Sequence, residues 1–273
     1  MRPRQWSKNL LLFAGLVFAA KLGDAIRWIE AIAAFAAYCA GSSAAYLVND
    51  VLDAQHDRTH PLKRFRPVAR GELSKRTAVM LAGALALVAL ALVAPLGIAS
   101  VGFLATFLLL QAGYSLGLKH VVLVDVFAIA ALFVIRSAAG ATAVDVRISP
   151  WLLLVTALLA LFLALAKRRS ELAVAGSSRP VLEGYSLPLV DQLIAVTVAS
   201  TIAAYAIYTF TAHSAALMAT IPFVVFGLFR YVLLVHRDDL GEEPENVLLT
   251  DRPLVLAVAG WAVTAALILA LTS

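Results

Sequence analysis

Long stretches without a charged side chain recur along the 273-residue chain, and short polar segments separate them. A helix that crosses the hydrocarbon core of a membrane needs about 20 mostly apolar residues. The longest stretch, Gln192–Phe229, fits two such helices with a polar break near His213, and the whole pattern predicts nine transmembrane helices. The other predicted spans are Asn9–Ala20, Trp28–Val48, Thr77–Ala94, Ile98–Leu118, Val121–Val144, Ile148–Ala166 and Pro253–Ser273.

Composition places the chain among integral membrane proteins. Apolar residues make up 62% of it and charged residues 14%, whereas soluble domains have about 45–50% and about 25%. We therefore expect an all-α fold, with one integral membrane domain over residues 1–273. The first 20 residues have the pattern of a signal peptide, but we interpret them as a retained helix, because Trp6 and Lys8 fit interfacial anchors.

Basic residues gather on one side of this predicted topology. With the N-terminus inside, the inside segments hold eighteen Lys and Arg residues and the outside loops hold three. Such an excess is typical of cytoplasmic loops. We expect a multi-pass protein of the cell membrane, with its N-terminus and active site on the cytoplasmic side. No nucleic-acid partner is expected, and a homo-oligomer is compatible with the sequence.

Acidic side chains stand where the second predicted helix leaves the membrane. The spacing of Asp50, Asp53 and Asp57 puts three carboxylates on one helical face. Like charges so placed repel one another unless something compensates them. Mg²⁺ takes oxygen ligands, often one or two carboxylates together with substrate phosphates, so we interpret the face as a metal site. The alternative is a solvated helix end that pairs with its own basic loop. The same face carries Tyr46, Asn49 and His60.

A basic segment follows the carboxylates at once, with His60, Lys63, Arg64 and Arg66 within seven residues. Arg binds phosphate through a planar pair of donors, and Lys binds it as a mobile point charge. Taken alone, the segment fits either phosphate binding or an anchor at anionic lipid headgroups. Its position directly after the carboxylates favours a site for a metal and a diphosphate.

Two short sequences resemble a known family. NDVLDAQHD (Asn49–Asp57) resembles the NDxxDxxxD motif of the UbiA superfamily of intramembrane prenyltransferases, and YSLGLK (Tyr114–Lys119) resembles a further turn of that superfamily. The resemblance implies nine helices around a central cavity open to the cytoplasm, and a substrate diphosphate bound with Mg²⁺. The metal ligands that it implies are Asn49, Asp50, Asp53 and Asp57.

The second acidic motif of the prenyl-transferring members, expected after the sixth helix, is missing. LALAKRRSELAVAGSSRPVLEGYS (residues 163–186) stands in its place. This replacement, with RPRQWSKN (Arg2–Asn9), IRSAAGATAVDVRISPW (Ile135–Trp151) and DRPL (Asp251–Leu254), resembles the decaprenyl-phosphate phosphoribosyltransferase branch of the superfamily. The match runs nearly from end to end in the same order.

The branch implies transfer of 5-phosphoribose from phosphoribosyl diphosphate to a membrane polyprenyl (decaprenyl) phosphate, with release of pyrophosphate. The product would feed arabinofuranose donors into cell-envelope synthesis. Asp50, Asp53 and Asp57 would be the catalytic carboxylates, and the helix Asn49–Asp57 would face the segment Ala166–Glu171 across the cavity. The residues expected to bind substrates are Lys8, Tyr46, His60, Lys63, Arg64, Arg66, Tyr114, Lys119, Arg136, Lys167, Arg168, Glu171 and Tyr185.

Three alternatives remain open. Arg136 lies in an apolar stretch, where a charge costs at least about 2.5–3.5 kcal/mol, and it either lines the cavity or pairs with Asp125 or Asp145. An aromatic or quinone prenyltransferase of the same superfamily would need the missing acidic motif. A transporter would show two matching halves with interrupted helices, and the sequence has no such repeat.

The acceptor adds one expectation about the cavity. Each CH₂ of a polyprenyl tail left in water costs about 0.8 kcal/mol, so the tail should enter from the bilayer through a lateral opening. Lys8 and Lys119 would guide the headgroup on the cytoplasmic side.

Overall fold

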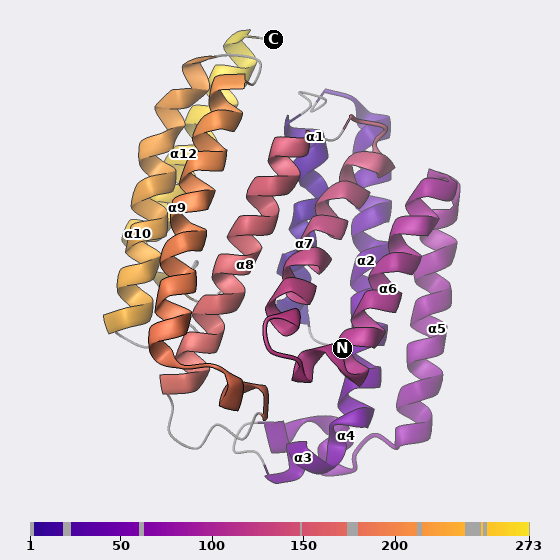
Figure 1. The fold of residues 1–273 in the computed structure, drawn as a ribbon. Helices are drawn as coiled ribbons and strands as arrows, with labels where there is room; N and C mark the ends of the chain where they lie inside the picture. Colours follow the sequence, from indigo (N-terminus) through magenta and orange to yellow (C-terminus); the bar gives the residue numbers. More distant parts are fainter. Residues whose placement is uncertain are drawn as a thin grey trace. The chain divides into compact units, whose positions relative to one another are not determined.

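A computed structural model describes residues 3–18, 23–59, 63–147, 149–173, 180–211, 215–237, 247 and 250–272. The regular elements of this described part are all helices, which confirms the all-α prediction (Figure 1). Eight of its helical stretches are long and apolar enough to cross a membrane. They contain α2 (Ala25–Leu52), α5 (Lys75–Val93), α6 (Ile98–Leu116), α7 (Val124–Ala143), α8 (Pro150–Ala173), α9 (Leu187–Thr211), α10 (Ile221–Arg237) and α12 (Arg252–Thr272).

The predicted first span is only partly described. Its described residues form the 3-10 helix η1 (Pro3–Phe13) and the short helix α1 (Ala14–Phe18), and Leu12 and Leu16 are fully buried. Ala19 and Ala20 lie outside the described residues. The ninth transmembrane helix therefore stays a prediction.

The chain divides into two compact units. One comprises Met1–Leu118 with Ile135–Ile148, and the other comprises Lys119–Val134 with Ser149–Ser273. We call them unit 1 and unit 2. The prediction of a single domain over residues 1–273 stays a prediction.

Small residues set the close packing in unit 1. An added Cβ on Gly140 would lie 2.1 Å from the carbonyl oxygen of Leu12, and one on Gly15 would lie 2.6 Å from Cα of Ala141. The N-terminal helices therefore cross α7 where glycines allow backbone contact, as is common between membrane helices. Along α2, Ala44 packs with residues of α5 in the same way.

Three short elements follow α2 before α5 begins: α3 (Ala54–Thr59), η2 (Lys63–Phe65) and α4 (Pro67–Arg70) (Figure 1). Pro67 is the first residue of α4, and the residue before a proline is confined to extended backbone. Arg66 accordingly has φ −66° and ψ 138°. Gly71 ends α4 with φ 81°, which favours glycine. The Arg58 Nε donates to the Ala69 carbonyl at 3.1 Å and ties α3 to α4.

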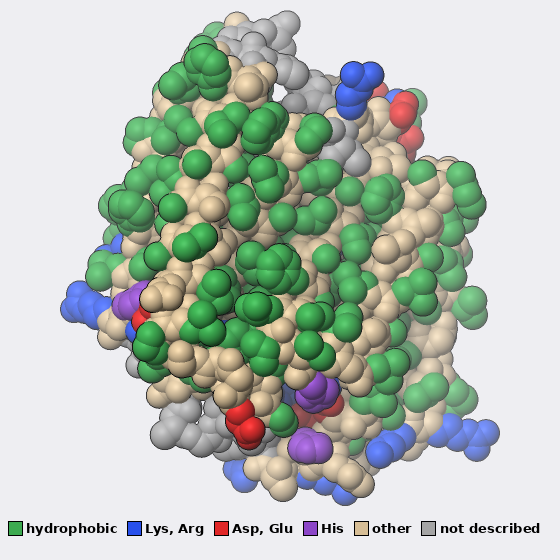
Figure 2. Space-filling view, viewed as in Figure 1, with side chains coloured by type: hydrophobic (Ala, Val, Ile, Leu, Met, Phe, Trp, Pro, Cys, Tyr) green, Lys and Arg blue, Asp and Glu red, His purple; other side chains and the backbone are tan. Residues whose placement is uncertain are grey.

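Unit 2 has a larger apolar core between α8, α9, α10 and α12. The rings of Phe162 and Tyr231 meet edge to face, with centroids 5.3 Å apart. Large apolar side chains also cover the outside of the protein, and Figure 2 shows them spread over the face in view. Leu109 and Leu256 are 73% and 71% exposed. Apolar surface of this extent fits helices surrounded by lipid.

Candidate active site

The carboxylate motif lies at a break between two helices. We predicted one continuous face, but α2 ends at Leu52 with Asp53 as its C-cap, and α3 begins at Ala54. The three carboxylates have different partners. Asp53 Oδ2 accepts from Asn49 Nδ2 at 3.0 Å, whereas Asp50 and Asp57 are buried and share a different partner.

That partner is Arg66. Its Nη1 donates to Asp57 Oδ2 at 2.6 Å and lies 3.3 Å from Asp50 Oδ1. Asp57 is 3% exposed and Asp50 is 8% exposed, so the guanidinium offsets a repulsion that burial would otherwise make large. The compensating charge that the sequence analysis required comes, in this structure, from the basic loop.

The other cations of the basic segment lie in different surroundings. Lys63 and Arg64 are exposed on η2, and the Arg64 guanidinium lies 4.9 Å from the centre of the Phe65 ring. His60 lies outside the described residues. Arg66, a member of the predicted basic group, contacts the carboxylates of Asp50 and Asp57.

The donor set fits Mg²⁺ in kind. Carboxylate and amide oxygens are the hard ligands that this ion takes, and Asn49, Asp50, Asp53 and Asp57 supply them. Among the described residues, no group of three or more His, Cys, Asp and Glu side chains is close enough to hold a metal as placed.

The N-terminal helix η1 lies beside the last turns of α2. Tyr46 Oη donates to Gln5 Oε1 at 3.4 Å, and Trp6 Nε1 donates to Ser43 Oγ at 3.2 Å. Lys8, half-buried, stands on the same short helix. Within unit 1, η1, which carries Lys8, thus lies along the turns of α2 that precede Asn49.

Arg136 is buried deep in unit 1, at 4% exposure. Its Nε donates to Asn9 Oδ1 at 2.9 Å, and its guanidinium lies 4.6 Å from the centre of the Phe107 ring. The two carboxylates considered as its partners have other contacts. Asp125 binds Arg168, and Asp145 lies 3.8 Å from Arg27.

Unit 1 has other buried polar groups besides Arg136. Asn9 is fully buried, and its Nδ2 donates to Cys39 Sγ at 3.3 Å. Three buried atoms on α2 and α6 have no hydrogen-bond partner among the described residues: Tyr38 Oη, Ser42 Oγ and Gln111 Oε1. Sequence reasoning missed this cluster, although polar residues within a predicted span are a recognisable signal.

In unit 2, the basic replacement segment forms a buried network. Arg168 is 1% exposed, and its Nε donates to Asp125 Oδ2 at 2.7 Å. Its Nη1 pairs with Glu171. Tyr185 Oη donates to the other oxygen of Asp125 at 2.7 Å. Asp125, which was not among the predicted site residues, therefore binds Arg168 and Tyr185, and Glu171 joins the network through Arg168.

Burial and the neighbouring carboxylate raise the pKa of the Tyr185 hydroxyl. The hydroxyl therefore stays protonated at neutral pH and can donate to Asp125. The remaining predicted residues lie at helix ends: Tyr114 near the end of α6, Lys119 on η4 (Leu118–His120) and Lys167 in the last turns of α8. That the segment Ala166–Glu171 faces Asn49–Asp57 stays a prediction.

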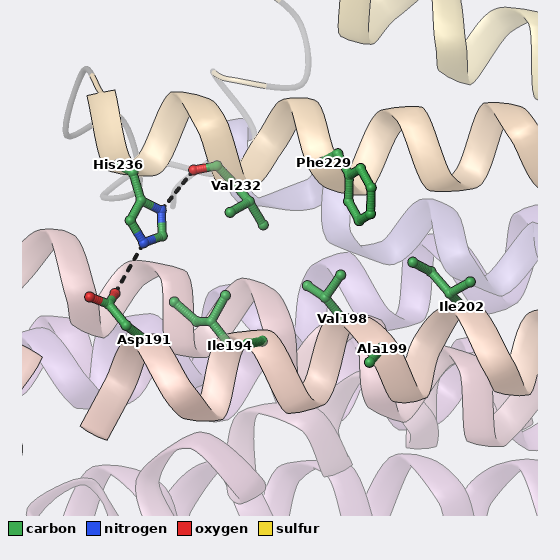
Figure 3. A pocket seen from close by; sticks show the side chains of 9 residues that line it. Asp191, Ile194, Val198, Ala199, Ile202, Phe229, Val232 and His236 are labelled. Atoms are coloured by element: carbon green, nitrogen blue, oxygen red, sulfur yellow. Dashed lines mark hydrogen bonds and ion pairs between the residues drawn. The ribbon is translucent and has the colours of Figure 1, made fainter. Parts of the chain in front are cut away.

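A second polar group lies at the end of an apolar groove between α9 and α10 (Figure 3). His236 Nε2 lies 3.2 Å from Asp191 Oδ1, which also accepts from Arg169 Nε at 2.8 Å. The other ring nitrogen, Nδ1, faces the Val232 carbonyl at 2.8 Å. The groove has a volume of about 370 Å³ and is lined by Asp191, Ile194, Ala195, Val198, Ala199, Ile202, Phe229, Val232 and His236.

Comparison with known proteins adds the family. Residues 10–250 match the model of the UbiA prenyltransferase family. The decaprenyl-phosphate phosphoribosyltransferase of Mycolicibacterium smegmatis is 33% identical over 96% of this chain and 88% of its own length. The protein of the same name from Mycobacterium tuberculosis is 34% identical over 97% of this chain and 91% of its own length.

Solved structures share the fold. A UbiA homolog from Archaeoglobus fulgidus, bound to GPP and Mg²⁺, superposes with a TM-score of 0.75 at 18% identity over 96% of this chain and 95% of that one. The apo structure of a UbiA homolog from Aeropyrum pernix gives 0.72 at 16% identity, with 99% of each chain covered.

Proposed function

The chain belongs to the UbiA prenyltransferase family, and from this we propose that it transfers 5-phosphoribose from phosphoribosyl diphosphate to a polyprenyl phosphate in the membrane. The observation that carries the proposal is the likeness, at about one third identity over nearly the whole chain, to relatives named decaprenyl-phosphate phosphoribosyltransferase. The basic segment at Lys167 and Arg168, in place of a second acidic motif, supports the same substrates.

In the proposed reaction, an oxygen of the lipid phosphate bonds to C1 of the ribose while the bond from C1 to the diphosphate breaks. The lipid phosphate is already an anion at pH 7, so the chain needs no general base. Catalysis then rests on positioning and on electrostatic stabilisation of the leaving group. Positive charge that develops at C1 resembles the charge developed in other glycosyl transfers.

Asn49, Asp50, Asp53 and Asp57 would hold Mg²⁺, which supplies charge neutralisation at the departing diphosphate. Arg66 contacts two of these carboxylates, Asp50 and Asp57. Its planar donors suit a phosphate as well as a carboxylate. We assign it to the diphosphate, which it would reach from its present position at the edge of the carboxylates.

We assign the remaining phosphates to cations on several elements. Lys63 and Arg64 are exposed beside Arg66 and suit the diphosphate or the lipid headgroup. Lys119 and Lys167 suit the 5-phosphate and the acceptor phosphate, and Arg136 with Tyr46 would line the interior of unit 1. Tyr114 and His60 complete the proposed set, and Lys8 would guide the acceptor headgroup.

We place the enzyme in the cell membrane with this site on the cytoplasmic side, on the strength of the eighteen-to-three distribution of basic residues. The phosphoribosyl donor is water-soluble and would arrive from that side. The polyprenyl tail would enter through a lateral opening, since hydrocarbon stays in the bilayer.

The test is a transfer assay with purified protein in detergent or vesicles. Decaprenyl phosphate, phosphoribosyl diphosphate and Mg²⁺ should give a lipid-linked phosphoribose, detected by mass spectrometry, and pyrophosphate in equal amount. A polyprenyl diphosphate with an aromatic acceptor should give no product. Product from that second mixture, and none from the first, would replace the proposal with aromatic prenyl transfer.

A further inference from the structure

The network around Arg168 joins three segments of unit 2 that are distant in the sequence. Asp125 lies in the first turn of α7 and is fully buried, and Arg168 lies 43 positions later near the end of α8. Tyr185 follows the 3-10 helix η5 (Pro180–Gly184) and donates to Asp125 from a third segment. One carboxylate therefore fixes three pieces of chain.

Tyr185 also holds the turn before α7. Its hydroxyl oxygen accepts from the Leu123 N–H at 2.8 Å. Leu123 has φ 65°, a left-handed conformation that a leucine adopts only against a steric cost. The turn is therefore held by tertiary contacts, and Tyr185 supplies one of them.

The backbone of η5 approaches the same turn closely. An added Cβ on Gly184 would lie 2.3 Å from Cγ2 of Val122. Two consecutive residues, Gly184 and Tyr185, therefore contact the turn, at Val122 and Leu123. The turn begins directly after η4, which carries Lys119.

Arg168 itself is poorly placed to meet a substrate. It is almost fully buried and already bonded to Asp125 and Glu171. Its neighbour Lys167 is only partly buried. The network thus links α8, which carries Lys167, to the turn that follows η4, which carries Lys119.

We propose that Asp125 is a positioning residue of the transfer reaction, which fixes Lys119 and Lys167 at the spacing that the phosphoribosyl donor requires. Asp125 acts through Arg168 on α8, and through Tyr185 on the turn after η4. Arg168 and Tyr185 are then positioning residues too. This inference rests on the proposed function, because it takes the two lysines as phosphate-binding groups.

The test uses Asp125→Asn, which keeps the side-chain shape and removes the charge, and Tyr185→Phe, which removes one hydroxyl. Asp251→Asn is the matched control, since Asp251 also pairs with an arginine in unit 2, Arg230 at 2.8 Å. Steady-state kinetics with both substrates and thermal unfolding would be measured for each variant in detergent.

Both network variants should raise the KM for phosphoribosyl diphosphate by roughly tenfold or more, because small displacements of binding groups are costly in such sites. The KM for polyprenyl phosphate should change much less. Asp251→Asn should leave both KM values unchanged. A purely structural role would lower the melting temperature and the apparent kcat while leaving both KM values as in the wild type, and that result would overturn the inference.

Calorimetric titration with phosphoribosyl diphosphate separates this inference from the proposed function. If the wild type transfers no phosphoribose, the proposed function fails. If the wild type is active while Asp125→Asn and Tyr185→Phe bind the donor as tightly as it does, the proposed function stands and the positioning role of Asp125 fails.

Discussion

Arg66 Nη1 lies 2.6 Å from Asp57 Oδ2, so a cation of the basic loop sits directly on the last carboxylate of the acidic motif. The same nitrogen is 3.3 Å from Asp50. Two acids seven residues apart are thus joined by a residue that follows them, on backbone confined by Pro67. Arg66, which we propose binds phosphate, therefore forms one connected group with Asp50 and Asp57, which we propose bind the metal.

Arg66→Ala should destabilise the protein, because Asp57 would stay buried without its bonded cation. We expect the free energy of unfolding to fall by about 2 kcal/mol. A fully buried pair would lose roughly 3–5 kcal/mol, but the Arg66 side chain is 21% exposed. Chemical unfolding in detergent measures the change, and Arg66→Lys, which keeps the charge, should lose less. Unchanged stability in Arg66→Ala would show that the pair contributes little.

Asp50→Asn, Asp53→Asn and Asp57→Asn should each abolish transfer while the protein stays folded in detergent. Each replacement removes one negative charge from the proposed metal ligands and keeps the side-chain shape. The transfer assay with saturating Mg²⁺ measures the loss, with a circular dichroism spectrum as the control for folding. Wild-type turnover in Asp53→Asn, or full turnover of the native protein in excess EDTA, would refute the metal assignment.

The spans and the acidic motif could be predicted because their signals are local. Apolar length alone located α5, α6 and α12 within a few residues, since a bilayer imposes that length on any helix that crosses it. The helix break at Asp53 was not predicted. Helical periodicity continues through the motif, and the Asn49 side chain that bonds Asp53 at the C-cap fits a continuous helix equally well.

The partners of the buried cations could not be predicted, because they are distant in the sequence. Arg136 meets Asn9 across 127 positions, and Arg168 meets Asp125 across 43. Composition indicates only that a buried charge needs a partner. Several acids satisfied that requirement for Arg136, and the structure gave it a neutral amide and an aromatic ring.

Asp251 should make stability fall at low pH. The hydrogen bonds from Arg230, and then from the Leu254 N–H, lower the pKa of Asp251 below its ordinary value. A carboxyl whose folded pKa is lowered stabilises the fold above its unfolded pKa of about 3.9, and this contribution is lost as the pH falls through the lower folded pKa. Thermal unfolding of the wild type and of Asp251→Asn at pH 7, 5, 4 and 3 would measure it. The two curves should converge below about pH 4, and a constant difference at every pH would contradict the assignment.

Lys167→Ala and Arg168→Ala should fail in different ways, although the two residues are adjacent. Arg168→Ala leaves the Asp125 carboxylate buried without its cation, and we expect a loss of roughly 3–5 kcal/mol in the free energy of unfolding. Lys167 is less buried, so Lys167→Ala should change stability by less than about 1 kcal/mol.

Binding of the donor, phosphoribosyl diphosphate, should also differ between the Lys167 and Arg168 variants. Lys167→Ala should weaken the binding of phosphoribosyl diphosphate by about tenfold, as expected for one charge-assisted hydrogen bond. It should weaken the binding of polyprenyl phosphate less. Chemical unfolding and calorimetric titration measure the two effects, with Arg168→Lys as the control that keeps the buried charge. Full stability with lost donor binding in Arg168→Ala would make Arg168 a direct phosphate ligand. Equal loss of both substrates in Lys167→Ala would leave Lys167 as a membrane anchor, because only a fixed phosphate partner makes the loss specific to the donor.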